Sequence, residues 1–156
     1  MTVYRLRVEA SAPLGVDRQA RSVRGRAVPW GQPAHVQGAA LPLLFLRGSL
    51  EVDRLEGPGA RPTPLLLGHD PDKAVGVATW WGDHETGLRA EFRVSRTTIG
   101  DDLLDDAEDG IRSGLSVGAD LFDVTESAGV LIVRGGIVRE VSVTAMPAFT
   151  SARLGE

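Results

Sequence analysis

Apolar and polar residues alternate one by one in segment after segment of this chain, and this two-residue period limits the possible folds more than any other feature. Strands place successive side chains on opposite faces of a sheet, so alternation is typical of strands with one buried face. The alternating segments are 3–8, 22–28, 73–81, 87–94, 115–124, 130–133 and 137–144. Glycine-containing turns separate several of them, which favours a mainly β barrel or sandwich.

Turns and loops divide these segments. Hairpin turns are predicted at 82–86 and 125–129, and the stretch 57–64 (GPGARPTP) is too rich in Pro and Gly for regular structure. A chain of 156 residues is long enough to bury one hydrophobic core. We therefore expect one domain over 1–156 with a flexible loop at 57–64.

Helical spacing occurs in one strong segment, 98–110, with Thr98 as the expected N-cap and Asp101 in the first turn. Gly110 is expected to stop this helix. Its predicted apolar stripe consists of Leu103, Leu104, Ala107 and Ile111. A weaker helical segment is predicted near 49–55.

The composition excludes several classes of function. The chain has no cysteine, so a disulfide framework, a thiolate nucleophile and a zinc–thiolate site are impossible. The net charge of −4 gives no basic footprint for nucleic acid. The longest apolar run, 41–46, is too short to span a bilayer, and the N-terminus lacks the apolar core of a signal peptide. We expect a cytoplasmic protein.

The segment 114–118 (GLSVG) fits G-x-S-x-G, the pattern around the nucleophile of α/β-hydrolases. Those enzymes place their acid and then their histidine after the serine. Here His35, His69 and His84 all precede Ser116, and too few residues follow Ser116 for the remaining strands. The α/β-hydrolase interpretation is therefore excluded.

Two other triad orders remain. The order His, Asp, Ser would use His69, then Asp101 or Asp102, then Ser116. These aspartates lie in the first turn of an acidic predicted helix, where a favourable interaction with the helix dipole explains them. The order His, Ser, acid uses His69 and Ser116 with Glu140 as the best downstream carboxylate.

Strand parity favours Glu140. Alternation places Ser116 and Gly118 on one face of their strand, and it places Glu140 on one face with Val138 and Ser142. A carboxylate among valines is costly to bury unless it has a partner, and a histidine held in one tautomer is such a partner. The alternative is that Glu140 faces water from a one-sided sheet.

His69 ends the apolar stretch PLLLGHD, where a buried strand would leave the sheet, a common position for a functional side chain. The alternative is a polar residue that opens the turn after it. A metal site formed by His69, Asp70, His84 and Glu85 is a further alternative. Adjacent residues on a turn rarely converge on one ion, so a solvated turn around His84 is favoured.

Taken in order, several segments resemble the prohead proteases of tailed bacteriophages, the capsid-maturation serine proteases similar in fold to herpesvirus assemblin. The resemblance covers about 24–153, and its motifs are VRGRAVPWG, LFLRGSLEV, PTPLLLGHD, VGVATWW, GLRAEFRV, DDAEDGIRSGLSVGAD and REVSVTAMPAFTSA. Each motif is weakly specific by itself. Their common order along the chain is specific.

The resemblance implies a partly open antiparallel β-barrel flanked by a few helices. It implies a serine endopeptidase with the catalytic residues Ser116, His69 and Glu140, and with no cofactor or metal. The substrates would be the phage major capsid protein and a scaffold segment, with self-cleavage as a further activity. The protein would be a homodimer or higher homo-oligomer inside the assembling procapsid in the bacterial cytoplasm, without nucleic acid or membrane partners.

The sequence departs from the family's pattern near its end. Phe149 stands where the family commonly has Asn, and Gly118 and the segment near Phe149 are the expected oxyanion-hole donors. The loop 57–64 is a candidate substrate-facing or self-cleavage segment. The alternative function is a catalytically inactive β-barrel that acts as a capsid or scaffold assembly module.

Overall fold

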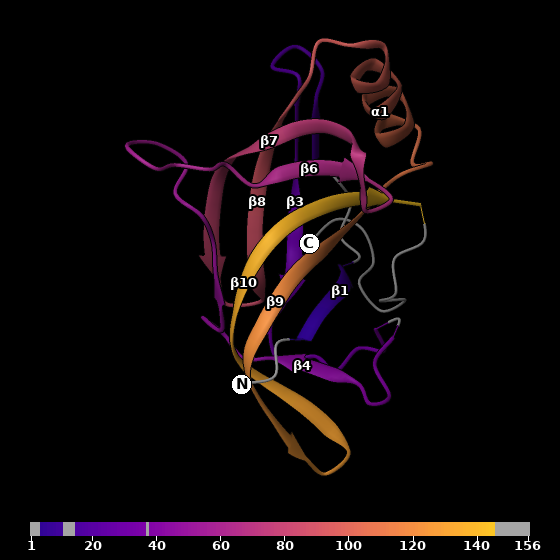
Figure 1. Cartoon of the computed structure of the whole chain (residues 1–156). Coiled ribbons are helices and arrows are strands. Elements are labelled where there is room, and N and C mark those ends of the chain that lie inside the picture. Colours follow the sequence, from indigo (N-terminus) through magenta and orange to yellow (C-terminus); the bar gives the residue numbers. More distant parts are fainter. Residues whose placement is uncertain (1–3, 11–14, 37, 146–156) are drawn as a thin grey trace.

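The computed structural model describes residues 4–10, 15–36 and 38–145, a part of the chain that is mainly β with one helix (Figure 1). The strands are β1 (Tyr4–Ala10), β2 (Gly15–Asp17), β3 (Ser22–Pro29), β4 (Leu43–Phe45), β5 (Leu50–Glu51), β6 (Pro64–Leu67), β7 (Asp70–His84), β8 (Gly87–Val94), β9 (Gly114–Ser127) and β10 (Val130–Thr144). The helix, α1 (Thr98–Glu108), lies between β8 and β9 in the sequence. No helix in the described ranges is long and apolar enough to cross a membrane.

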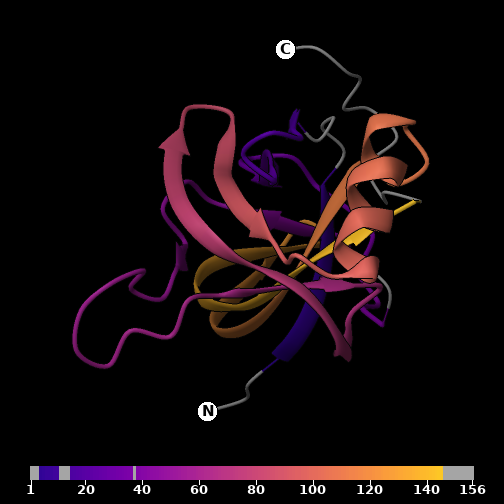
Figure 2. The same ribbon diagram turned by 90° about the horizontal axis from the view of Figure 1, so that it is seen from above.

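All the strands belong to one mixed sheet. Eight of them follow the order β1-β9-β10-β6-β7-β8-β3-β2, and β4 and β5 pair with β10 beside this path. β10 runs parallel to β4, β5 and β6 and antiparallel to β9. The sheet curves until β1 and β3 lie against each other, but no ladder among the described residues joins them (Figures 1 and 2).

The expected antiparallel barrel with a few helices is therefore corrected to an open, mixed sheet with one helix in the described ranges. Hairpins produce antiparallel neighbours, whereas β4, β5 and β6 reach β10 through long connections that leave them parallel to it. Alternation within a strand reports which face is buried, and it carries no information about the direction of the neighbouring strand.

The core forms from the inward-facing residues of this curved sheet. On β8, Leu88, Ala90, Phe92 and Val94 are buried and the residues between them are not, as the alternation predicts. The ring of Trp81 packs edge to face on Phe92, with centroids 6.1 Å apart. Burying one such apolar side chain contributes about 2 kcal/mol to the free energy of unfolding.

The first half of β9 is buried on both of its faces. Residues 114–119 are all buried, and β1 and β10 pair along the two edges of this half of the strand. On the face that carries Ser116, the ring of His69 contacts the Ser116 hydroxyl. Small residues alternate here with Leu and Val, so the strand can be covered on both sides. Ser116 therefore lies in the interior rather than on an exposed turn.

Helix α1 begins one residue earlier than expected, because Thr97 and not Thr98 is its N-cap; the Oγ1 of Thr97 accepts a hydrogen bond from the N–H of Gly100 at 3.3 Å. The buried stripe consists of Leu103, Leu104 and Ala107. Ile111 was expected to extend this stripe, but its side chain is 56% exposed. The chain leaves the helix through Gly110, whose φ of +72° turns the backbone before Ile111.

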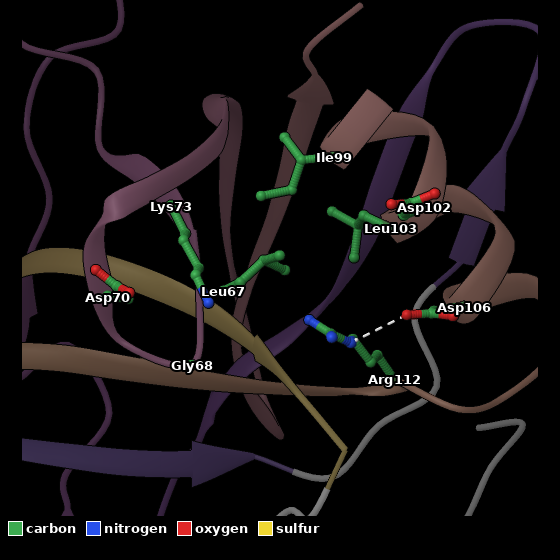
Figure 3. Close-up of a pocket in the computed structure, with 9 residues that line it drawn as sticks. All are labelled: Leu67, Gly68, Asp70, Lys73, Ile99, Asp102, Leu103, Asp106 and Arg112. Carbon is green, nitrogen blue, oxygen red and sulfur yellow. Dashed lines mark ion pairs between the residues drawn. The ribbon is translucent and has the colours of Figure 1, made fainter. Parts of the chain in front are cut away.

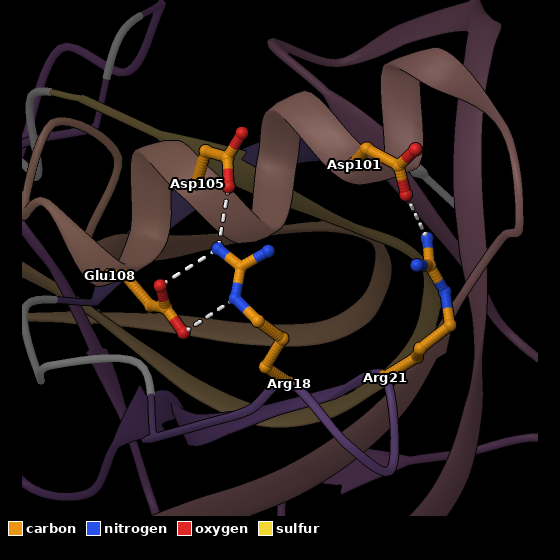
Figure 4. A network of polar contacts seen from close by, with 5 residues as sticks. All are labelled: Arg18, Arg21, Asp101, Asp105 and Glu108. Atoms are coloured by element: carbon orange, nitrogen blue, oxygen red, sulfur yellow. Dashed lines mark hydrogen bonds and ion pairs between the residues drawn. The ribbon is translucent and has the colours of Figure 1, made fainter.

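Two arginines from the β2–β3 connection hold the acidic side of α1 (Figure 4). The guanidinium of Arg18 donates hydrogen bonds to Asp105 at 2.5 Å and to the two carboxylate oxygens of Glu108 at 2.9 and 2.7 Å. Arg21 pairs with Asp101 at 2.7 Å. The hydrogen bonds from Arg18 hold the pKa of the Glu108 carboxyl below its usual value. Because Asp101 faces Arg21, its role in this structure is to anchor the helix.

Several element bounds differ from the sequence predictions. The hairpin turns are shorter than expected, since β7 reaches His84 and β9 reaches Ser127 before their partners begin. The segments 130–133 and 137–144 form one strand, in which register shifts around Gly135 absorb the glycines between them. The helix expected at 49–55 is wrong, because this segment contains the short strand β5. Residues 57–63 form neither helix nor strand, as expected, whereas Pro64, the last residue of the expected loop, begins β6.

Candidate active site

His69 lies in the two-residue turn that joins β6 to β7. Leu67 pairs with Asp70 across this turn, and φ is +56° at Gly68 and +60° at His69. Two positive φ values are typical of a type I′ turn, which suits a tight hairpin. Glycine adopts this conformation freely, whereas a residue with a Cβ is disfavoured there by about 1–2 kcal/mol. The backbone of His69 therefore needs support from the rest of the fold.

That support comes from Ser142 on β10. The Oγ of Ser142 accepts a hydrogen bond from the backbone N–H of His69 at 2.8 Å and donates one to Oε2 of Glu140 at 3.0 Å. A hydroxyl can donate once and accept twice, so both bonds are compatible. Ser142 is fully buried. One side chain thus fixes both the turn that carries His69 and the carboxylate of Glu140.

The three residues singled out from the sequence meet in one hydrogen-bonded chain. Nε2 of His69 lies 2.7 Å from the Oγ of Ser116, and Nδ1 of the same ring is hydrogen-bonded to Oε1 of Glu140. Ser116 is fully buried, and the side chains of His69 and Glu140 are only 9% and 17% exposed. A hydroxyl, an imidazole and a carboxylate in this order can move a proton away from the hydroxyl.

Pairing between β9 and β10 sets the positions of two members of this chain. Ser116 pairs with Ser142, and Gly118 pairs with Glu140. A Cβ on residue 118 would lie 2.5 Å from Oε1 of Glu140. The second glycine of the G-x-S-x-G segment therefore leaves room for the carboxylate. The expectation that Gly118 also donates to an oxyanion stays a prediction, and Phe149 lies outside the described residues.

Ser142 is the residue of this site that the sequence reasoning did not single out. The available signal was its parity, since it lies on the same predicted face as Glu140 and two positions further on. Parity could not show that its hydroxyl also reaches the backbone of His69, because that contact joins residues far apart in the chain.

A cleft of about 480 Å³ lies beside the His69 turn, between that turn and α1 (Figure 3). Its lining consists of Leu67, Gly68, Asp70, Lys73, Ile99, Asp102, Leu103, Asp106 and Arg112. Lys73 and Arg112 extend into it from opposite sides, and Arg112 pairs with Asp106 at 3.1 Å. The volume is within the usual range of ligand pockets. The residues on both sides of His69 thus face a space that can hold side chains of a bound peptide.

The residues of the alternative sites do not join this arrangement. Asp101 pairs with Arg21, and Asp102 lines the cleft without a bond to His69 among the described residues. The ring of His84 packs against Trp80 with centroids 6.2 Å apart, and His35 is exposed. Within the described ranges, no group of three or more His, Asp or Glu side chains could hold a metal ion.

The fold and the site together define a class: a mainly β protein in which a buried serine, a histidine and a carboxylate form one hydrogen-bonded chain. Among solved structures, the chain is similar to the bacteriophage T4 capsid assembly protease gp21. The TM-score is 0.52 at 16% sequence identity, over 81% of this chain and 82% of that one. No family model and no curated protein matches the sequence.

At this identity the similarity establishes the fold alone. It confirms the phage prohead protease-like fold that the ordered motifs led us to expect.

Proposed function

We propose that this chain is a serine endopeptidase of phage procapsid maturation. Ser116 is the nucleophile, His69 is the general base, and Glu140 orients the imidazole. The observation that carries the proposal is the continuous hydrogen-bonded chain from Glu140 through His69 to Ser116. A fold shared with a capsid assembly protease over 81% of the chain supports it independently.

The proposed reaction begins when Nε2 of His69 takes the proton of the Ser116 hydroxyl. The Oγ then attacks the carbonyl carbon of a peptide bond, and the resulting tetrahedral intermediate collapses to an acyl ester. His69 gives its proton to the leaving amine. Water, deprotonated by the same imidazole, then hydrolyses the ester and restores Ser116.

Glu140 accepts the hydrogen bond from Nδ1–H, which leaves Nε2 free to act as the base. Its negative charge also stabilises the imidazolium that forms during the reaction. Ser142 holds the second oxygen of Glu140 and the backbone of His69, so it is a positioning residue. The chemistry proposed here requires no metal and no cofactor.

The proposed substrates are the phage major capsid protein and a scaffold segment, cleaved inside the assembling procapsid by a homodimer or higher homo-oligomer. The structural neighbour is described as a capsid assembly protease, which supports this substrate class. The Pro- and Gly-rich segment 57–64 is a candidate site of self-cleavage, because residues 57–63 lie outside the helices and strands, where proteolytic cleavage is most common.

The burial of Ser116 bears on regulation. Ser116 has no exposed surface, so a substrate carbonyl can reach its Oγ only after the site opens. We expect the isolated protein to be nearly inactive and the protein inside procapsids to be active. The same burial favours a second candidate function, a catalytically inactive capsid or scaffold assembly module.

Co-expression with the capsid protein and scaffold of the same phage tests the proposal. Mass spectrometry of the assembled particles should show cleaved capsid or scaffold protein with the wild-type chain and only full-length protein with Ser116→Ala. Ser49→Ala is the matched control, because Ser49 is buried and its Oγ has no hydrogen-bond partner among the described residues. Cleavage by Ser116→Ala would exclude Ser116 as the nucleophile. Particles that assemble with the wild-type chain yet contain no cleaved protein would favour the assembly module.

A further inference from the structure

Four arginines gather on the outer face of β3 and β8, the two strands whose inner faces lie in the core. Arg24 and Arg26 lie on β3, and Arg89 and Arg93 lie on β8. The residues that alternate with them, such as Phe92, are buried, so the arginines point away from the core. We call the surface formed by these four side chains and Trp80 the arginine face.

The charges of the arginine face are balanced only in part, because the single carboxylate among them, that of Glu91, lies opposite Arg24 across the ladder. Arg26 pairs directly with Arg89 across the antiparallel ladder, a placement in which like charges destabilise the sheet. Within the described residues none of the four arginines makes an ion pair with a carboxylate. Glu91 lies among them and forms no ion pair within 4.0 Å with any described side chain. This concentration of positive charge stands out on a chain of net charge −4.

An exposed aromatic ring borders these arginines. Trp80 on β7 pairs with Glu91 and is 45% exposed, although a side chain of this size is usually buried. Its ring lies over Gly82, where a Cβ would overlap it, and packs edge to face on His84. A shallow hollow of about 500 Å³ is lined by Arg24, Trp80, His84, Arg89 and Glu91.

We propose that the arginine face binds an acidic peptide segment of a partner protein in an extended conformation. Carboxylates of such a peptide form paired hydrogen bonds with guanidinium groups and supply the missing negative charge. Arg89 and Arg93 are four residues apart on β8, about 13 Å, so they match every fourth side chain of an extended peptide. The hollow beside Trp80 accommodates an apolar side chain between the acidic ones.

An acidic peptide fits this face better than a nucleic acid does. Single strands are bound by several aromatic rings on which successive bases stack, whereas the arginine face offers one exposed tryptophan. The carboxylate of Glu91 lies in its centre, and the net charge of −4 repels a phosphate backbone at long range. The arginine face lies on strands other than those that carry Ser116 and Glu140, so this inference does not depend on the proposed peptidase activity.

Fluorescence anisotropy with the full chain tests the inference, in a Ser116→Ala background so that a probe cannot be cleaved. The probe is a labelled peptide of alternating Glu and Ser, with a Lys–Ser peptide and an oligothymidylate as comparisons. We expect saturable binding of the Glu–Ser peptide alone, weakening as salt is raised, with a change in the tryptophan fluorescence of the protein. The double variant Arg24→Ser/Arg89→Ser should weaken binding by about tenfold or more.

Arg134→Ser is the matched control, since Arg134 is exposed on β10 away from this face and should leave the Kd unchanged. Thermal unfolding checks each variant, and the single variant Arg93→Ser replaces the double variant if the latter does not fold. Equal binding of the Glu–Ser and Lys–Ser peptides, or an unchanged Kd in the arginine variants, would overturn the inference. Tighter binding of oligothymidylate with the same arginine dependence would also overturn it, in favour of a nucleic-acid surface.

Discussion

In the part of the chain that the structure describes, two turns of two residues have positive φ at both positions, and one of them belongs to the candidate active site. Gly68 and His69 join β6 to β7 with φ of +56° and +60°, and Ala128 and Gly129 join β9 to β10 with φ of +49° and +76°. Each turn forces one residue with a Cβ into the left-handed region. Ser142 and the ring contacts hold His69, whereas Ala128 is exposed and its methyl group forms no hydrogen bond.

The difference shows what distinguishes a strained residue at a site from one in an ordinary turn. Backbone strain alone is the same in both places. At His69 the backbone N–H is hydrogen-bonded to Ser142, and the two ring nitrogens are hydrogen-bonded to Glu140 and Ser116. The polar groups that hold the strained residue, and not its φ value, mark the candidate site.

Replacing His69 and Ala128, one at a time, by glycine should give the largest difference in activity between the two turns. His69→Gly and Ala128→Gly remove the same kind of backbone strain, but only the first removes the proposed base. We expect His69→Gly to lower the rate of capsid-protein cleavage by about 10⁴-fold or more and Ala128→Gly to leave it unchanged. Cleavage time courses in assembled particles measure both. A comparable rate in the two variants would mean that His69 is not the base.

Glu140→Gln should have the next largest effect. The amide keeps the shape of the carboxylate but loses the charge that stabilises the imidazolium, so the loss of rate should be about a hundredfold smaller than for His69→Gly. The same time courses provide the comparison. A loss as large as that of His69→Gly would give Glu140 a role beyond orienting the ring.

Gly118→Ala tests whether the glycine leaves room for Glu140. The new methyl group would meet Oε1 at 2.5 Å, so the carboxylate must move away from His69. We expect a loss of cleavage rate and a loss of about 1–3 kcal/mol in the free energy of unfolding. Gly135→Ala is the control, since its methyl group would meet the ring of the exposed Phe122, which can swing aside. Full activity in Gly118→Ala would contradict the proposed role.

Ser142→Ala should have a smaller effect on the rate, because it removes a residue that acts through two others. Losing its hydroxyl leaves the N–H of His69 and Oε2 of Glu140 without this partner, at a cost of about 1–3 kcal/mol in stability. We expect kcat to fall about tenfold or more with KM nearly unchanged. Ser49→Ala should be neutral, because the Oγ that it removes is buried and has no hydrogen-bond partner in the described ranges. An equal change in both variants would reduce Ser142 to an ordinary core serine.

The same two glycine variants should also differ in their free energy of unfolding, and this is the smallest of the expected effects. Ala128→Gly should raise the free energy of unfolding by about 1 kcal/mol, or Tm by about 2–4 °C, because glycine adopts the left-handed conformation without strain. His69→Gly should lower Tm, since Ser116 and Glu140 lose their hydrogen bonds to the ring. Differential scanning calorimetry measures both shifts. Equal stabilisation by the two glycines would show that the bonds to His69 contribute nothing.

Several strands and the three candidate site residues could be predicted from patterns within short stretches of the sequence. Alternation identified β3, β8 and the paired segments of β9 and β10 because it reports burial on one face of a strand. Chain order excluded an α/β-hydrolase, and parity singled out Glu140 as a carboxylate in need of a partner. His69, Ser116 and Glu140 could therefore be named together before any coordinates, although their catalytic roles stay predictions.

Other features depend on contacts that local rules do not contain. The parallel pairing of β10 with β4, β5 and β6 joins distant segments, so alternation gave no hint of the mixed sheet. Ile111 fits the helical stripe by spacing but lies beyond the turn at Gly110. The double role of Ser142 requires β6 and β10 to be neighbours, which only the folded sheet provides.

Phosphonylation of Ser116 tests the central claim most directly. Particles that contain the protein are treated with a small fluorophosphonate, and peptides are mapped by mass spectrometry. The bond from Ser116 to His69 predicts one adduct, on Ser116, and no adduct in His69→Ala particles. An adduct of equal yield in both samples, or none in the wild-type particles, would contradict the claim that His69 activates Ser116.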